Sequence, residues 1–130
     1  MIFVDTNVFM YAVGREHPLK MQAREVFERA IAGPDRPLMT SAEVMQELLH
    51  AYLPVDRTDT LNDALELLAR SVQDVWAVES EDVLHAVDLA AAYRTLGARD
   101  LIHLACCQRR GVREIRTFDR ALKAAFAAIG

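Results

Sequence analysis

Short apolar segments alternate with helical segments along the chain, and this alternation constrains the fold more than any other feature. The segments expected to form strands are residues 2–5, 36–41, 74–78 and 113–118. The segments with helical patterns are residues 18–32, 41–52, 58–72, 80–97, 99–111 and 119–128. Strands that alternate with helices form parallel sheets that helices cover on both faces. We therefore predict one α/β domain spanning residues 1–130.

The composition excludes several other classes of protein. The chain is 52% hydrophobic and 26% charged, as in ordinary globular domains. No run approaches the roughly 18 apolar residues that a membrane span needs, and the N-terminus lacks the basic leader of a signal peptide. Cys106 and Cys107 are neighbours and poorly placed to bridge, which favours buried thiols in a reducing compartment. We therefore expect a cytoplasmic protein with no membrane association.

The charge is unevenly distributed along the chain, although the net charge is only −4. Residues 1–93 contain 7 Lys and Arg and 16 Asp and Glu. Residues 94–123 contain 8 Lys and Arg and only 3 Asp and Glu. Such an asymmetry is typical of a surface that faces phosphate groups, and solvated helix faces produce it equally well. The candidates for contacts to a nucleic acid are Arg99, Arg116 and Arg120.

Four acidic residues lie where a parallel sheet forms its ligand site, outside the carboxyl ends of the strands. Asp5 follows the first strand, and Glu47 lies in the helix after the second strand. Asp100 and Asp119 each open a helix, so each is also a candidate N-cap worth about 1 kcal/mol. Glu43 competes with Glu47, but we assign it mainly to a capping box with Thr40 and leave Glu47 free for the site.

Several carboxylates in one cleft repel one another, by roughly 4 kcal/mol for two charges 4 Å apart at an effective dielectric of 20. Either some are protonated or a cation joins them. Oxygen ligands suit Mg²⁺ or Mn²⁺, which can activate a water for attack on a phosphodiester. The acids would then hold the cation, and the basic segment 94–123 would hold the RNA or DNA backbone.

Four motifs resemble those of the PIN-domain ribonucleases, and within them the VapC toxins of bacterial toxin–antitoxin pairs. The motifs are "FVDTNVFMYA", "TSAEVMQELL", "ARDLIHLA" and "IRTFDRAL", and together they cover nearly the whole chain. In the second motif Glu47 lies six residues after Ser41, as in the "SxxxxxE" pattern of the family. The resemblance implies a three-layer α/β/α sandwich with a short central parallel sheet.

The resemblance also implies a function and a set of site residues. It implies RNA cleavage by a toxin in which Asp5, Glu47, Asp100 and Asp119 bind Mg²⁺ or Mn²⁺, inhibition by a cognate antitoxin, and a homodimer. The apolar faces of residues 18–32 and 58–72 are the candidate dimer surfaces. The residues expected to support the acids are Thr6, Asn7, Glu43, His103 and Thr117.

Other interpretations fit parts of the same pattern. The pairs Glu47-x-x-His50 and Asp100-x-x-His103 resemble the ligands of a di-metal site in a four-helix bundle. A phosphatase that uses Asp5 as its nucleophile is a further interpretation. Such enzymes usually carry a second acid two residues after the nucleophile, and this chain has Asn7 there. A catalytically idle module that binds RNA or a partner would have the same fold. Trp76 is a candidate for base stacking, although a place in the core suits it better.

Overall fold

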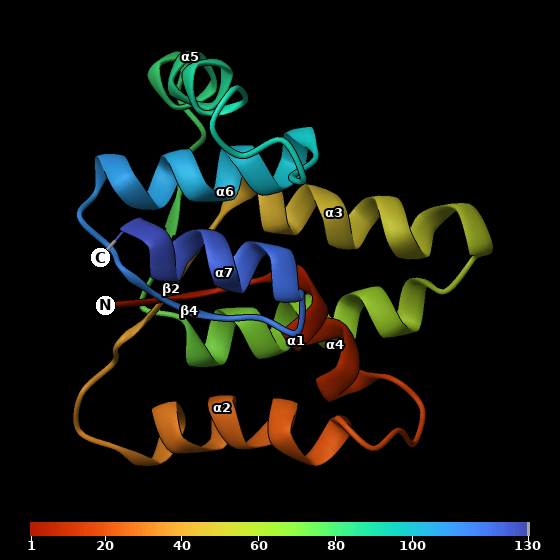
Figure 1. Ribbon diagram of the computed structural model, residues 1–130. Helices are drawn as coiled ribbons and strands as arrows, with labels where there is room; N and C mark the ends of the chain where they lie inside the picture. Colours follow the sequence, from red (N-terminus) through yellow and green to blue (C-terminus); the bar gives the residue numbers. More distant parts are fainter. Residues whose placement is uncertain (130) are drawn as a thin grey trace.

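The computed structural model describes residues 1–129 and has a parallel sheet between helices (Figure 1). The strands are β1 (Ile2–Val4), β2 (Leu38–Ser41), β3 (Asp74–Trp76) and β4 (Glu114–Arg116). All neighbours pair in parallel, in the order β3-β2-β1-β4. The carboxyl ends of the strands therefore share one edge of the sheet, and the segment after β1 lies near its middle. This confirms the predicted α/β fold.

Seven helices and a short 3₁₀ segment surround the described part of the sheet. The helices are α1 (Thr6–Val13), α2 (Lys20–Ala32), α3 (Ala42–Tyr52), α4 (Thr58–Ser71), α5 (Ser80–Leu89), α6 (Ala98–Arg109) and α7 (Arg120–Ile129), and the 3₁₀ segment is η1 (Leu53–Val55). In Figure 1, α1, α2 and α4 lie on one side of the sheet, with α5 and α6 on the other and α7 beside β4. This is the expected arrangement of three layers.

The core follows from the apolar patterns of the sequence. Phe3 and Val4 of β1 are fully buried, as expected for a central strand that helices cover on both faces. The apolar stripe of α4 is buried in the same core, and so are Ala23, Phe27 and Ala30 of α2. These two faces, which the sequence suggested for a dimer, pack within the chain itself.

The structure differs from the sequence-based prediction at three helix boundaries. Residues 6–13 were read only as an apolar run, yet they form α1, which Asp5 caps. The helix expected over residues 80–97 ends at Leu89, and Gly97 lies at the start of α6 instead of at the end of α5. The N-cap of α5 is Glu79, the residue before the expected range. Glycine occurs both at the N-cap and just after the last turn of helices, so the position of Gly97 alone did not fix the boundary.

The architecture settles one alternative interpretation of the sequence. A parallel sheet is incompatible with a four-helix bundle, and His50 lies exposed on α3, so the di-metal interpretation is wrong. None of the helices within residues 1–129 is long and apolar enough to cross a membrane.

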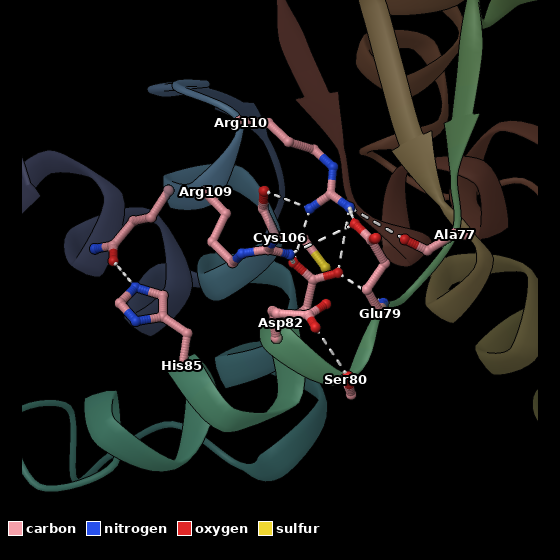
Figure 2. Close-up of polar contacts among 10 residues, drawn as sticks. Ala77, Glu79, Ser80, Asp82, His85, Cys106, Arg109 and Arg110 are labelled. Carbon is pink, nitrogen blue, oxygen red and sulfur yellow. Dashed lines mark hydrogen bonds and ion pairs between the residues drawn. The ribbon is translucent and has the colours of Figure 1, made fainter.

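A buried ion network joins α5 to the end of α6 (Figure 2). Asp82 is 0% exposed and accepts hydrogen bonds from Arg109 (2.6 Å), from Arg110 (2.8 Å) and from the backbone N–H of Glu79 (2.8 Å). The Arg110 guanidinium also lies 5.0 Å from the ring centroid of Trp76. Burial opposes the charge, but the hydrogen bonds from Arg110, Glu79 and Arg109 outweigh it and hold the pKa of Asp82 well below its usual range. The network therefore fixes α5 against α6.

Substituting Asp82→Asn is expected to lower the free energy of unfolding by about 3 kcal/mol, because it removes the charge that pairs both arginines. Since the folded-state pKa lies below the unfolded value, this stabilisation is present at neutral pH and is lost as the pH falls below about 4. Urea denaturation at pH 7 and pH 3 measures both effects. Asp88→Asn, an exposed carboxylate on the same helix, is the matched control. Equal stability of the two variants at pH 7 would contradict the assignment.

Candidate active site

Asp5 is buried at the carboxyl end of β1, in the position that the sequence predicted for a site residue. Its side chain is the N-cap of α1, where Oδ1 accepts a hydrogen bond of 2.7 Å from the backbone N–H of Thr6. The backbone N–H of Asp5 donates to the carbonyl of Arg116, which continues the pairing between β1 and β4. The backbone of the sheet therefore fixes where this carboxylate lies.

The hydroxyl of Thr117 connects the segment after β1 with the segment after β4. It donates a hydrogen bond of 2.7 Å to Oδ2 of Asp5. It accepts hydrogen bonds from the side-chain amide of Asn7 (3.3 Å) and from the backbone N–H of Asp119 (3.0 Å). The amide oxygen of Asn7 in turn accepts from the backbone N–H of Phe118. Thr117 and Asn7 therefore orient Asp5 and hold Asp119 near it, as expected for supporting residues.

Glu47 lies on α3 and faces the same site. Its Oε2 accepts a hydrogen bond of 3.0 Å from the hydroxyl of Thr6, and its Oε1 lies 2.6 Å from Nε2 of His103. His103 is 0% exposed, and its Nε2 also lies 3.7 Å from Oδ1 of Asp5. The sequence grouped Thr6 and His103 with the supporting residues, and the structure places both against the acids.

Three of these side chains form a potential cation site. Asp5, Glu47 and His103 each offer one ligand atom, and these atoms lie within 4.8 Å of one another. Despite their short contact, Glu47 Oε1 and His103 Nε2 are not aligned as a hydrogen bond, and both atoms are buried without a hydrogen-bond partner. Buried polar atoms are normally satisfied, so this pair fits a site that accepts a further ligand. The donor set of two carboxylates and one imidazole suits a divalent cation.

The charges of the acids depend on their neighbours. Burial raises the pKa of Asp5, although His103 and the hydrogen bonds from Thr117 and Thr6 partly oppose the shift. Burial also acts on Glu47, but its contact with His103 outweighs this effect and lowers the pKa of Glu47. The pKa of His103 is raised by Glu47 and Asp5, which outweigh its burial. His103 and Glu47 therefore favour each other's charged forms across their short contact.

Asp100 and Asp119 complete the acidic group from the starts of α6 and α7. Burial and the nearby charges of Asp5 and Asp119 raise the pKa of Asp100 to about 6. Asp119 also caps α7, because its Oδ1 accepts a hydrogen bond of 3.1 Å from the backbone N–H of Leu122. The predicted capping role of Asp119 is therefore correct. Asp100 is not the N-cap of α6, since that position belongs to Gly97.

The predicted capping box at the start of α3 is wrong. Ser41 is the N-cap residue, makes no side-chain capping hydrogen bond, and has a buried hydroxyl without a partner. Glu43 faces α6, where its Oε1 lies 4.0 Å from Nε of Arg99. Burial and the charge of Glu47 raise the pKa of Glu43. Glu43 therefore belongs to the rim of the acidic group.

The basic candidates lie around this edge of the molecule. Arg99 and Arg116 have side chains 45% and 44% exposed, and Arg120 is exposed at the start of α7. Trp76, the candidate for base stacking, is stacked on Phe3 with a centroid distance of 5.9 Å and is not free for a ligand. Tyr11 and Phe118, which the sequence did not single out, contact each other beside Asn7 and Thr117. Their signal was weak, because single aromatic residues in apolar runs usually pack in the core.

Comparisons with known proteins agree with this geometry. The PIN-domain family matches residues 2–126. Ribonuclease VapC23 of Mycobacterium tuberculosis is 61% identical over 126 residues, which cover 97% of this chain and 98% of the relative. Ribonuclease VapC13 of the same organism is 39% identical over 120 residues, which cover 92% and 91% of the two chains.

A solved structure shows the same fold at lower identity. The crystal structure of Mycobacterium tuberculosis VapC20, described as a toxin that cleaves the sarcin–ricin loop, has a TM-score of 0.73 and 18% identity to this chain. The match covers 96% of this chain and 95% of VapC20. Together with the family match, these likenesses define a PIN domain. The chain belongs to the PIN-domain family, in its VapC ribonuclease branch.

Proposed function

We propose that this protein is a toxin endoribonuclease that depends on Mg²⁺ or Mn²⁺ and uses Asp5, Glu47, Asp100 and Asp119. The observation that carries the proposal is the meeting of carboxylates from four distant segments at the carboxyl edge of the sheet, around buried ligand atoms without partners. Burial raises the pKa of both Asp5 and Asp100, and the neighbouring carboxylates add to each shift, so a bound cation would offset a cost that the charged acids otherwise carry. The 61% identity to a named ribonuclease supports the same reaction.

The side chains of this chain have separate tasks in RNA hydrolysis. Asp5 and Glu47, oriented by Thr6 and Thr117, would hold the cation with Asp100 and Asp119. A bound divalent cation supplies a water activated for attack on phosphorus and stabilises the leaving oxygen. The carboxylates can accept the proton that this water loses. The RNA backbone would lie along Arg99, Arg116 and Arg120, so cleavage is expected to weaken as salt rises.

The partners that we propose are an RNA substrate and a cognate antitoxin, because the relatives are VapC proteins and VapC20 is described as a toxin. We also propose a homodimer. Its surface is expected among the exposed apolar side chains of α3 and α5, which include Leu49 and Leu84 (44% and 65% exposed), rather than on α2 and α4. Light scattering with Leu49→Asp and Leu84→Asp tests this, and a monomeric wild-type protein would contradict it.

Sequencing the RNA ends that the purified protein generates tests the proposed activity. Cleavage is expected at defined positions, is expected to stop with EDTA, and is expected to return with Mn²⁺ or Mg²⁺. The matched control is a preparation of the Asp5→Asn variant made in the same way, which detects a contaminating nuclease. RNA binding without turnover at saturating metal would favour the idle module. Cleavage that persists in EDTA would exclude the proposed use of the acids.

A further inference from the structure

Three aromatic side chains contact one another next to the segment that carries Thr117, and we call them the aromatic platform: Tyr11, His17 and Phe118. The Tyr11 ring lies 4.7 Å from the His17 ring, centroid to centroid, and 5.3 Å from the Phe118 ring. The first pair is tilted by 42°, and the second meets edge to face at 90°. The three residues come from α1, from the segment before α2, and from the segment between β4 and α7.

A chain of hydrogen bonds through Asn7 and Thr117 connects the backbone of Phe118 with Asp5. Asn7 accepts from the backbone N–H of Phe118 and donates to Thr117, whose hydroxyl donates to Asp5. Tyr11 follows Asn7 by four residues on α1, so it lies on the same face about one turn away, about 6 Å along the helix axis. The aromatic platform is therefore a direct neighbour of the residues that orient Asp5.

The outer end of the aromatic platform is open to solvent. His17 is exposed, whereas Tyr11 and Phe118 are only partly buried against the core. Nδ1 of His17 accepts a hydrogen bond of 3.1 Å from the backbone N–H of Leu19, which sets the ring orientation. The surrounding loop is held by Lys20, whose Nζ donates to the carbonyl of Gly14 at 2.8 Å. The ring of His17 is thus held in place although it has few core contacts.

We propose that the aromatic platform stacks a base of the substrate RNA next to the phosphodiester that is cut. This inference rests on the proposed function and adds a binding site for a nucleobase. RNA that is read in single-stranded form is typically splayed, with its bases stacked on aromatic side chains. Stacking is tolerant of sequence because every base has a π-face. Arg15 is exposed in this loop and is the candidate contact for the neighbouring phosphate, because the adjacent Glu16 pairs with Lys20.

Core packing alone does not account for the aromatic platform. A residue that only fills the core is buried, but His17 is exposed and still contacts Tyr11. An RNA base suits this surface better than an apolar helix of a protein, because the platform is small and is joined by hydrogen bonds to the residues around Asp5.

The test compares two substitutions that separate the ring of His17 from its hydrogen bond. His17→Asn keeps an acceptor for the backbone N–H of Leu19 but removes the ring, whereas His17→Phe keeps a ring and removes the acceptor. His85→Asn, on α5, is a control for loss of an imidazole elsewhere. The probes are a labelled oligoadenylate and an abasic oligomer of equal length with the same phosphates, measured by fluorescence anisotropy in EDTA.

Wild-type protein and His17→Phe are expected to bind the oligoadenylate roughly ten-fold more tightly than the abasic oligomer, as for one stacked base. His17→Asn is expected to bind both oligomers equally. Equal binding of the two oligomers by wild-type protein would overturn the inference, and so would full discrimination by His17→Asn. The proposed function fails on a different result, namely no cleavage of any RNA by wild-type protein with Mn²⁺.

Discussion

The Asp5→Asn variant is expected to lose RNA cleavage by roughly 100- to 1,000-fold, the range for removing one electrostatic group preorganised around reacting atoms. In the absence of metal the same variant is expected to be at least as stable as wild-type protein. Burial raises the pKa of Asp5, so its charge costs stability at neutral pH, and a neutral amide avoids this cost. The amide oxygen still accepts from the N–H of Thr6, but the amide nitrogen cannot accept from the hydroxyl of Thr117, so the expected gain in stability is small. Cleavage rates at saturating RNA and melting temperatures in EDTA measure the two effects.

The opposite signs of these two effects make the prediction specific. A residue needed only for folding would lose activity and stability together, whereas a site residue trades stability for function. Asp63→Asn, an exposed carboxylate on α4, controls for the change of charge and is expected to alter neither quantity. A cleavage rate within two-fold of wild type for Asp5→Asn would exclude Asp5 from the reaction.

The order of strands and helices was predictable because apolar periodicity reports which segments are buried. Asp5 was predictable as a site residue for the same reason, since it ends a buried strand and the carboxyl ends of parallel strands meet at one edge. The helix α1 was missed because its residues are apolar on nearly every side, so the pattern lacks the period of 3.6. The N-cap signal of Asp5 before Thr6 would have located it.

The finer arrangement of the site depends on tertiary contacts that no local pattern encodes. The role of Glu43 was misjudged because the capping box is a local motif, whereas the actual neighbour of Glu43 is Arg99 on a distant helix. The contact between His103 and Glu47 joins α6 to α3 across the site. Tyr11 and His17 are close to each other only because the loop after α1 turns back. Such contacts need the folded chain.

Manganese binding is expected to weaken about tenfold between pH 7 and pH 5, because the proposed ligand Asp100 must be deprotonated to bind the cation. Burial, Asp5 and Asp119 raise the pKa of Asp100 to about 6, so its carboxylate is mostly protonated at pH 5 in metal-free protein. The free energy of unfolding of the metal-free protein is expected to follow the opposite trend with pH. The pKa of Asp100 is higher in the folded than in the unfolded state, so stability falls as the pH rises from about 4 to 6. Isothermal titration calorimetry and thermal melting in EDTA measure the two trends.

The Asp100→Asn variant separates this carboxyl from the other acids of the site. It is expected to bind Mn²⁺ more weakly at pH 7, with a smaller change between pH 7 and pH 5, and to melt at a temperature that depends less on pH in EDTA. The remaining pH dependence then reports Asp5 and His103, whose pKa values are also raised, and Glu43 at the rim. Calorimetry in two buffers of different protonation enthalpy counts the protons released on binding, and the variant is expected to release fewer than wild-type protein. Equal proton release would place Asp100 outside the cation site.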